Sequence, residues 1–343
     1  MGVQEDRLPP RVTIRQVAEN AGVSVSAVSK VLRDAYGVSA SLRARVEASI
    51  RELNYRPLAA ARGMRGRTYT LGLVLPDIRN PFFAEILDGV ASALAETQYQ
   101  VMIGITEPAA SEDAVIEAMI DRQVEGIILV GTVNVEAVVD ALASRLPLVA
   151  LGFHAPTMRT FDTVNTDDQL GARLAVRHLV ANGFLATTMF SLDRPESTII
   201  AQRELGYRRE MIRCGLSEHI NIVRVGSAKA QIVAGAKRVL DEPVRPRALF
   251  CWSDLVAVEV LSVASDMGLT SPNDVAIVGY DNSPVCALAQ NGLTSVNQPG
   301  AVLGQSAARL LLERVGGRVS AQHIILQPKL IMRASSAAVS TCG

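Results

Sequence analysis

The feature that most constrains the fold is a regular alternation of short apolar runs and amphipathic segments that begins near residue 70. The apolar runs have the length of buried strands and lie at 70–75, 100–105, 126–130 and 146–151. Segments with helical periodicity separate them, at 82–97 and 111–122. The alternation restarts after Gly183, with strands expected at 187–191, 248–251 and 275–278, and helices at 199–214 and 255–267. Buried strands that alternate with helices predict two lobes, each with a parallel, doubly wound sheet.

Polar and aromatic residues follow the expected strands. The carboxyl ends of the strands in such a sheet form the edge at which ligands bind, so two lobes should face each other across a binding cleft. The residues expected to line it are Asp77, Phe82, Phe83, Asp167, Ser197, Arg203, Trp252, Ser253, Asp254, Asp281 and Gln298. Carboxylates and an arginine fork can bind hydroxyl pairs, and aromatic rings can pack on the apolar face of a pyranose. The pattern therefore predicts a site for a small polar molecule.

Simpler roles stay open for some of these residues. A carboxylate near a helix start can be an N-cap or an ion-pair partner between the lobes, and for Asp254 the cap is the stronger alternative. Either Phe82 or Phe83 is expected to face the core, and the pattern does not decide which.

Residues 12–53 have a different pattern, with three short helical segments and no strand. Thr13 and Gln16 have the spacing of a capping box. Gly22 suits a tight left-handed turn, and Ser24 can cap a second helix at 25–32. A third helix is expected at 41–53. The residues expected to face inward are Ala27, Val28, Val31 and Leu32 in the second helix, and Leu42, Val46, Ile50 and Leu53 in the third.

Two short helices joined by a glycine turn are typical of a helix-turn-helix, whose second helix enters the major groove of DNA. The residues predicted to face the groove are Val25, Ser26, Ser29 and Lys30. A valine can contact a thymine methyl, while hydroxyls and a lysine can bind base edges or phosphates. A plain three-helix bundle is the alternative.

The charge distribution favours a polyanionic partner for this head. Residues 1–67 contain twelve Lys and Arg against six Asp and Glu, although the whole chain has 34 of each. A basic head on an acidic remainder is typical of nucleic-acid binding by the head alone. A solvated basic surface would give the same count.

These motifs lie in a longer segment whose amino-acid sequence resembles that of a known family. The segment from Val12 to Leu32, VTIRQVAENAGVSVSAVSKVL, resembles the start of the LacI/GalR family of bacterial transcriptional regulators. The resemblance continues through GVS at 37–39, RARV at 43–46 and LNYRP at 53–57, and extends to about residue 330. It implies an all-α helix-turn-helix head at 1–57, a hinge at 58–67, and a bilobed α/β core similar to periplasmic binding proteins at 68–343.

The resemblance also implies particular residue roles. It makes Asp167, Arg203, Asp281 and Gln298 effector contacts. It extends the predicted DNA contacts to Thr13, Ser24, Arg33, Tyr55, Ala61 and Met64. The chain should cross between the lobes more than once, with a first lobe at about 68–179 and 299–320 and a second at about 180–298 and 321–334. Ser253 stands where relatives often have Asn, so the identity of the effector cannot be inferred from that of a relative.

The hinge departs from the family pattern. By resemblance, two hinges fold in the minor groove and each inserts an apolar side chain between base steps, usually Leu and here Met64. Gly63 should cost about 1 kcal/mol relative to Ala in a helix. A flexible linker is the alternative.

The sequence lacks the motifs that are typical of several other functional classes. The four cysteines have no metal-ligand spacing, and we find no phosphate-binding loop, nucleophile elbow or His/Cys metal set. Neither an enzyme nor a cofactor is therefore expected. A sugar-binding protein without DNA function is the alternative for the core, but residues 1–11 lack the apolar stretch of a secretory signal.

The sequence therefore predicts a cytoplasmic, nucleoid-associated repressor of carbohydrate or sugar-acid metabolism genes. Its predicted partners are a palindromic operator in double-stranded DNA, a small-molecule effector such as a sugar or sugar acid, and a second copy of the chain. Residues 334–343 lack a leucine heptad, which favours a dimer over a tail-assembled tetramer. The identity of the effector, and whether it induces or corepresses, stay open.

Overall fold

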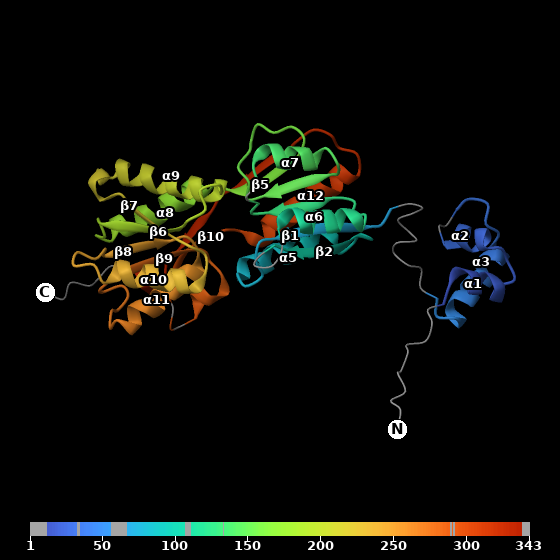
Figure 1. Ribbon diagram of the computed structural model, residues 1–343, viewed down its shortest axis with the longest axis horizontal. Coiled ribbons are helices and arrows are strands. Elements are labelled where there is room, and N and C mark those ends of the chain that lie inside the picture. Colours follow the sequence, from blue (N-terminus) through green and yellow to red (C-terminus); the bar gives the residue numbers. More distant parts are fainter. Residues whose placement is uncertain are drawn as a thin grey trace, which may run out of the picture. The chain divides into compact units, whose positions relative to one another are not determined.

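The computed structural model describes residues 12–32, 35–55, 67–106, 111–132, 134–288, 290 and 292–337. The chain divides into two compact units, Met1–Thr68 and Tyr69–Gly343. The first unit is helical, and the second contains two six-stranded sheets (Figure 1). None of the helices in the described residues has the length and apolar composition needed to cross a membrane.

The described residues of the head form three helices: α1 Ile14–Asn20, α2 Val25–Leu32 and α3 Ala40–Glu52. The capping box is present, because the backbone N–H of Gln16 donates to Thr13 Oγ1 (3.4 Å) and Gln16 Oε1 accepts from the backbone N–H of Thr13 (2.7 Å). Gly22 has φ +62°, as the tight turn requires. Ser24 begins α2 by accepting from the backbone N–H of Ala27 at 3.1 Å.

The buried face of α2 differs in part from the prediction. Val28 and Val31 are buried in the head core, as expected. Leu32, predicted to be buried, is 38% exposed, because it is the last residue of α2. Ala27 is only partly buried, and Ser29, predicted to face outward, is buried. Because α2 packs against both α1 and α3, its buried stripe is wider than a single ridge.

The first lobe of the core is a parallel sheet with helices on both faces. Its strand order is β11-β5-β4-β3-β1-β2. The strands are β1 Thr70–Leu75, β2 Gln100–Ile105, β3 Ile127–Val130, β4 Leu148–Leu151, β5 Asp162–Thr166 and β11 His323–Leu326. Helices α5 Pro81–Leu94 and α12 Gly300–Val315 bury one face of the sheet, and α6 Glu112–Asp121 and α7 Glu136–Ala143 bury the other.

The second lobe repeats this architecture with one antiparallel edge strand. Its strand order is β12-β10-β9-β8-β6-β7, and β12 is antiparallel to β10. The strands are β6 Thr187–Leu192, β7 Asn221–Val225, β8 Ala248–Cys251, β9 Ala276–Asp281, β10 Thr294–Asn297 and β12 Lys329–Ile331. Helices α8 Asp168–Ala181 and α9 Thr198–Arg213 cover one face, and α10 Lys229–Leu240 and α11 Asp254–Asp266 cover the other. Short 3₁₀ turns lie at Ser217–His219, Pro284–Ala287 and Ala334–Ser336.

The chain crosses between the two lobes three times, after β5, after β10 and after β11. The first crossing lies about one helix earlier than predicted, because α8 packs on α9 and on the second sheet. The last lies later than predicted, because β11 pairs with β5 in the first sheet. The prediction placed 168–179 in the first lobe and 323–326 in the second. Both assignments were wrong, because α8 packs on the second sheet and β11 belongs to the first.

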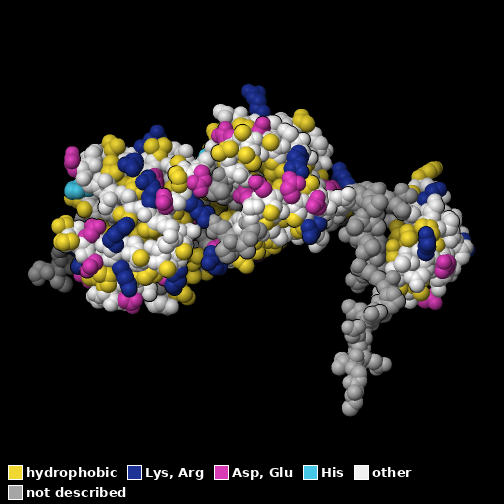
Figure 2. Space-filling model, in the orientation of Figure 1, with side chains coloured by type: hydrophobic (Ala, Val, Ile, Leu, Met, Phe, Trp, Pro, Cys, Tyr) yellow, Lys and Arg dark blue, Asp and Glu magenta, His cyan; other side chains and the backbone are white. Residues whose placement is uncertain are grey.

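The visible face of the core carries Lys and Arg side chains intermixed with Asp and Glu (Figure 2). No field of a single sign dominates that face, so its electrostatics give no sign of a large polyanionic partner there. The chemistry that distinguishes the core lies instead between its lobes.

Candidate functional site

The outer face of α2 is the candidate DNA-reading surface. Ser26 and Lys30 are exposed and lie one helical turn apart, so they point the same way. Val25 is partly buried against the head core, and Ser29 is 7% exposed. Of the four side chains predicted to face the major groove, two are therefore exposed on the outer face of α2.

The other predicted DNA contacts have mixed placements. Thr13 and Ser24 are exposed N-cap residues whose side-chain oxygens accept backbone N–H groups. Tyr55 is partly buried and packs against the head core. Arg33, Ala61 and Met64 lie outside the described residues.

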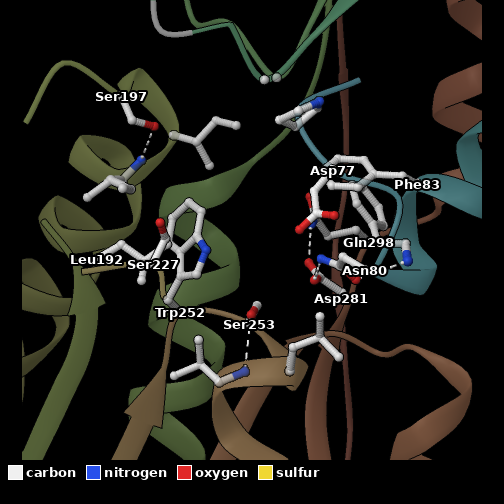
Figure 3. A pocket seen from close by; sticks show the side chains of 18 of the residues that line it. Asp77, Asn80, Phe83, Leu192, Ser197, Ser227, Trp252, Ser253, Asp281 and Gln298 are labelled. Atoms are coloured by element: carbon white, nitrogen blue, oxygen red, sulfur yellow. Dashed lines mark hydrogen bonds between the residues drawn. The ribbon is translucent and has the colours of Figure 1, made fainter. Parts of the chain in front are cut away.

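A cavity of about 400 Å³ lies between the lobes, at the carboxyl ends of both sheets. Its volume suits one small ligand. Asp77, Asn80 and Phe83 approach from the first lobe, and Leu192, Ser197, Ser227 and Trp252 lie on the opposite side (Figure 3). A ligand in this cavity would therefore contact both lobes.

Arg203 forms the charged wall of the cavity. Its side chain is 4% exposed and is paired with Asp168, with Nε 2.8 Å from Oδ1. Its Nη1 donates to the carbonyl of Trp252 at 2.7 Å, and its guanidinium lies 3.5 Å from the centre of the Tyr280 ring and 4.2 Å from that of Trp252. His154 Nε2 lies 2.8 Å from Asp168 Oδ2 and completes the network.

Asp281 ends β9 and connects three parts of the cavity. Its Oδ2 accepts from Asn80 Nδ2 of the first lobe (3.0 Å), and its Oδ1 accepts from Gln298 Nε2 of the crossing segment (2.7 Å; Figure 3). Burial, and then the charge of Asp254, raises the pKa of Asp281 to about 7 despite these hydrogen bonds. The backbone of Asp281 has φ +110°, a strained value that favours glycine and is often found at functional sites.

Comparison with known proteins places both units. Residues 13–57 match the model of bacterial regulatory proteins of the lacI family, and residues 176–336 match the periplasmic binding protein-like domain. The repressor CytR of Escherichia coli K12 is 31% identical over 335 residues, which cover 95% of this chain and 97% of CytR. The chain belongs to the LacI family of bacterial regulatory proteins. It is therefore a DNA-binding transcriptional regulator with an effector-binding core.

Two further relatives span nearly the whole LacI-family chain. The repressor PurR of Photobacterium profundum is 28% identical and covers 94% of this chain and 98% of its own. The structure of the regulator CelR in complex with cellobiose is 28% identical, with a TM-score of 0.70, and covers 95% of this chain and 100% of its own.

Most of the predicted cleft residues line the cavity between the lobes. They are Asp77, Phe82, Phe83, Ser197, Arg203, Trp252, Ser253, Asp281 and Gln298. Phe82 is the more buried of the two phenylalanines, at 8% exposed, and belongs to the first-lobe core. Ser197 and Ser253 are also the N-caps of α9 and α11. The Arg79 guanidinium holds the pKa of Asp77 below its usual value, although burial acts in the opposite direction.

Two predicted contacts do not line the cavity. Asp167 is the N-cap of α8 and accepts from the backbone N–H of Leu170 at 2.9 Å. Asp254 is fully buried below the cavity wall and accepts from the backbone N–H and hydroxyl of Ser283 and from the hydroxyl of Ser295. Burial raises the pKa of Asp254. Both carboxylates are hydrogen-bonded within the protein, and neither lines the cavity.

Among the cavity residues that escaped sequence reasoning are Asn80, Thr166 and Asp168. The Asn-Pro pair at 80–81 is a helix-start signal and could have identified Asn80 as a cap, which the structure shows by the bond from the backbone N–H of Phe82 to Asn80 Oδ1. Asp168 follows Asp167 directly, and pattern alone cannot tell which of the two turns inward. In the described residues, no group of three or more His, Cys, Asp or Glu side chains is placed to hold a metal ion.

Proposed function

We propose that this LacI-family protein is a repressor that binds a palindromic operator as a homodimer, and that a sugar or sugar acid in the interlobe cavity controls its operator affinity. We further propose that it acts by binding alone, without catalysis or a cofactor. The DNA partner would place it in the cytoplasm at the nucleoid.

The observation that carries the proposal is that one cavity is built by both lobes. Asn80 and Phe83 come from the first lobe, and Arg203 and Trp252 from the second. A ligand that contacts both walls has a different free energy in each arrangement of the lobes, so it shifts the population between them. A regulator with such a cavity has the means to respond to a ligand.

The chemistry of the cavity supports a sugar-like effector. Phe83 and Trp252 offer ring faces, while Asp281 and Gln298 offer polar atoms near them. This combination suits a ring that has hydroxyls at its edge and apolar C–H groups on its face. The CelR relative, whose structure contains cellobiose, gives independent support for the same class.

A dimer is proposed because one reading helix contacts only a few base pairs. Two copies related by a two-fold axis would place two α2 helices in successive major grooves of a palindrome. By family resemblance, the first-lobe helices, including α5, would form part of the contact between the copies.

The direct test is a gel shift of the full chain on DNA from upstream of its own gene. The wild type should shift this DNA, and Lys30→Ala should weaken the shift about tenfold and lower its dependence on salt. Lys237→Ala, which removes an exposed lysine of α10, is the matched control and should bind like the wild type. Loss of binding only in the control, or no shift by the wild type on any candidate operator, would refute the proposal.

A further inference from the structure

Helices α8 and α9 carry two pairs of arginines where they pack against each other on the second sheet (Figure 1). Arg173 and Arg177 lie four residues apart on α8, and Arg209 and Arg213 lie four residues apart on α9. Residues with this spacing are neighbours on a helix surface, and like charges placed there repel each other. The second lobe therefore concentrates positive charge along the contact between these two helices.

Glu210 of α9 binds three of these arginines. Its side chain is fully buried. Its Oε2 accepts from Arg173 Nε (3.3 Å), and its Oε1 accepts from Arg177 Nε (3.0 Å) and Arg213 Nε (2.8 Å). Burial would raise the pKa of Glu210, but the hydrogen bonds from Arg213 and Arg177 lower it to about 2. The carboxylate is therefore ionised at neutral pH and holds the three guanidinium groups close together.

This arginine cluster, Arg173, Arg177, Arg213 and Glu210, carries more positive charge than its carboxylate neutralises. Guanidinium groups stay protonated in proteins, so three positive charges and one negative charge give the cluster a net charge of +2. Within the described part of the chain, no second carboxylate forms an ion pair with these arginines. A buried carboxylate needs a positive partner, but a single arginine provides one. The remaining charge is available to a ligand.

The outer nitrogens of the cluster can be reached from solvent. The side chains of Arg173, Arg177 and Arg213 are 39%, 47% and 55% exposed. Arg173 and Arg177 bond Glu210 through Nε, and among the described residues their Nη1 and Nη2 atoms have no hydrogen-bond partner. The buried carboxylate thus fixes one edge of each guanidinium and leaves the Nη donors of Arg173 and Arg177 for a molecule outside the protein.

We propose that the arginine cluster binds a dianionic phosphate group, either inorganic phosphate or the phosphate of a small monoester. The charge of this group is equal and opposite to that of the cluster. Its oxygens can accept from several guanidinium N–H groups at once, and its charge reduces the repulsion among the arginines. None of the four cluster residues lines the interlobe cavity, so this second ligand site goes beyond the proposed function.

The test is calorimetric titration of the full chain, at pH 7.5 and low salt, with inorganic phosphate and separately with glycerol 2-phosphate. The wild type should bind at least one of them, and the probe that binds more tightly identifies the source of the phosphate group. The double variant Arg173→Gln, Arg177→Gln should bind that probe about tenfold more weakly, because it lacks the free Nη donors. The double variant Lys237→Gln, Arg238→Gln removes the same charge from exposed positions of α10 and should bind like the wild type.

A comparison of pH values tests the charge match in the wild type alone, so it does not depend on the folding of a variant. The second ionisation of a phosphate monoester has a pKa of about 6, so glycerol 2-phosphate should bind more tightly at pH 7.5 than at pH 5.5. Sulfate is a dianion at both pH values and should bind equally, because Glu210 and the arginines do not titrate in this range.

Three results would overturn the proposal and leave the arginines as internal partners of Glu210. The first is no binding of either phosphate probe by the wild type. The second is equal affinity of the two double variants, which would make any binding a general effect of surface charge. The third is an equal change with pH for sulfate and glycerol 2-phosphate. None of these measurements uses operator DNA or a sugar, so they are independent of the proposed function.

Discussion

Arg203 is a charge held almost out of water, and its surroundings show how that is possible. An isolated buried guanidinium would be strongly destabilising, so it needs a carboxylate, further hydrogen bonds or ring faces. Asp168 supplies the carboxylate at 2.8 Å, and Tyr280 and Trp252 supply ring faces. Burial would raise the pKa of Asp168, but the charge of Arg203 and the hydrogen bond with His154 hold it below its usual value. The wall of the cavity therefore depends on Asp168.

Replacing Asp168 should destabilise the core. Asp168→Asn removes the negative charge beside buried Arg203 and should lower the free energy of unfolding by about 3 kcal/mol. Asp167→Asn is the matched control, because Asn caps a helix about as well as Asp, and should cost less than about 0.5 kcal/mol. Urea denaturation of both variants measures the difference. Equal decreases in the free energy of unfolding would mean that the Arg203–Asp168 ion pair contributes no more to stability than the helix cap at Asp167.

Asp281 should make stability depend on pH. Its pKa is raised from the ordinary 3.8 to about 7, so the stability from burying the neutral acid is present below about pH 4 and is lost as the pH rises through 7. The free energy of unfolding of Asp281→Asn, relative to the wild type, should therefore increase between pH 5 and pH 8. Asp77→Asn is the control, because the pKa of Asp77 is lowered and its difference should be flat over this range. A flat difference for Asp281→Asn would contradict the assignment.

Elements were predictable from sequence wherever apolar periodicity was clear. The helix 25–32 and the strands 70–75, 100–105 and 248–251 have the predicted bounds. The strand β5 escaped because it reads DTVNT, which is polar although fully buried. Its first residue, Asp162, is held by Arg314, by Arg318 and by the backbone N–H of Gln322. Periodicity cannot detect burial that is made possible by distant ion pairs. Because β5 was missed, the crossing that follows it was placed too late in the chain.

Close packing of α5 on α12 is a second feature at this scale. A Cβ at Gly89 of α5 would lie 1.9 Å from the carbonyl oxygen of Ala301, and one at Gly304 would lie 2.0 Å from that of Ile86. Gly89→Ala should therefore force the helices apart and lower the free energy of unfolding by about 3 kcal/mol. Ala91→Ser, on the exposed side of α5, should change it by less than about 0.5 kcal/mol. Similar values for the two variants by urea denaturation would rule out the tight contact.

At the scale of the whole molecule, the two lobes are connected around the cavity in two ways. The chain passes between them three times, and the side chain of Asp281 forms hydrogen bonds with residues outside its own lobe. Asp281 lies where β9 ends, bonds Asn80 of the first lobe and accepts from Gln298 beside the second crossing. The sequence predicted the two-lobed plan, and most of the residues that it predicted for the cleft line the cavity, because strand ends are visible in the pattern. It could not predict Asn80 as the partner of Asp281, because 201 residues separate the two and only the folded chain brings them together.

Such an arrangement should couple the ligand to the operator by one factor in both directions. If a sugar changes operator affinity by some factor, operator DNA must change sugar affinity by the same factor. Lys30→Ala should lower operator affinity about tenfold with and without sugar, because Lys30 is proposed to contact DNA and does not line the cavity. The ratio of the two affinities should therefore match that of the wild type. Fluorescence anisotropy of a labelled operator, with and without saturating sugar, measures this ratio. A different ratio in Lys30→Ala would mean that α2 itself takes part in the response, and that the head does more than read the DNA.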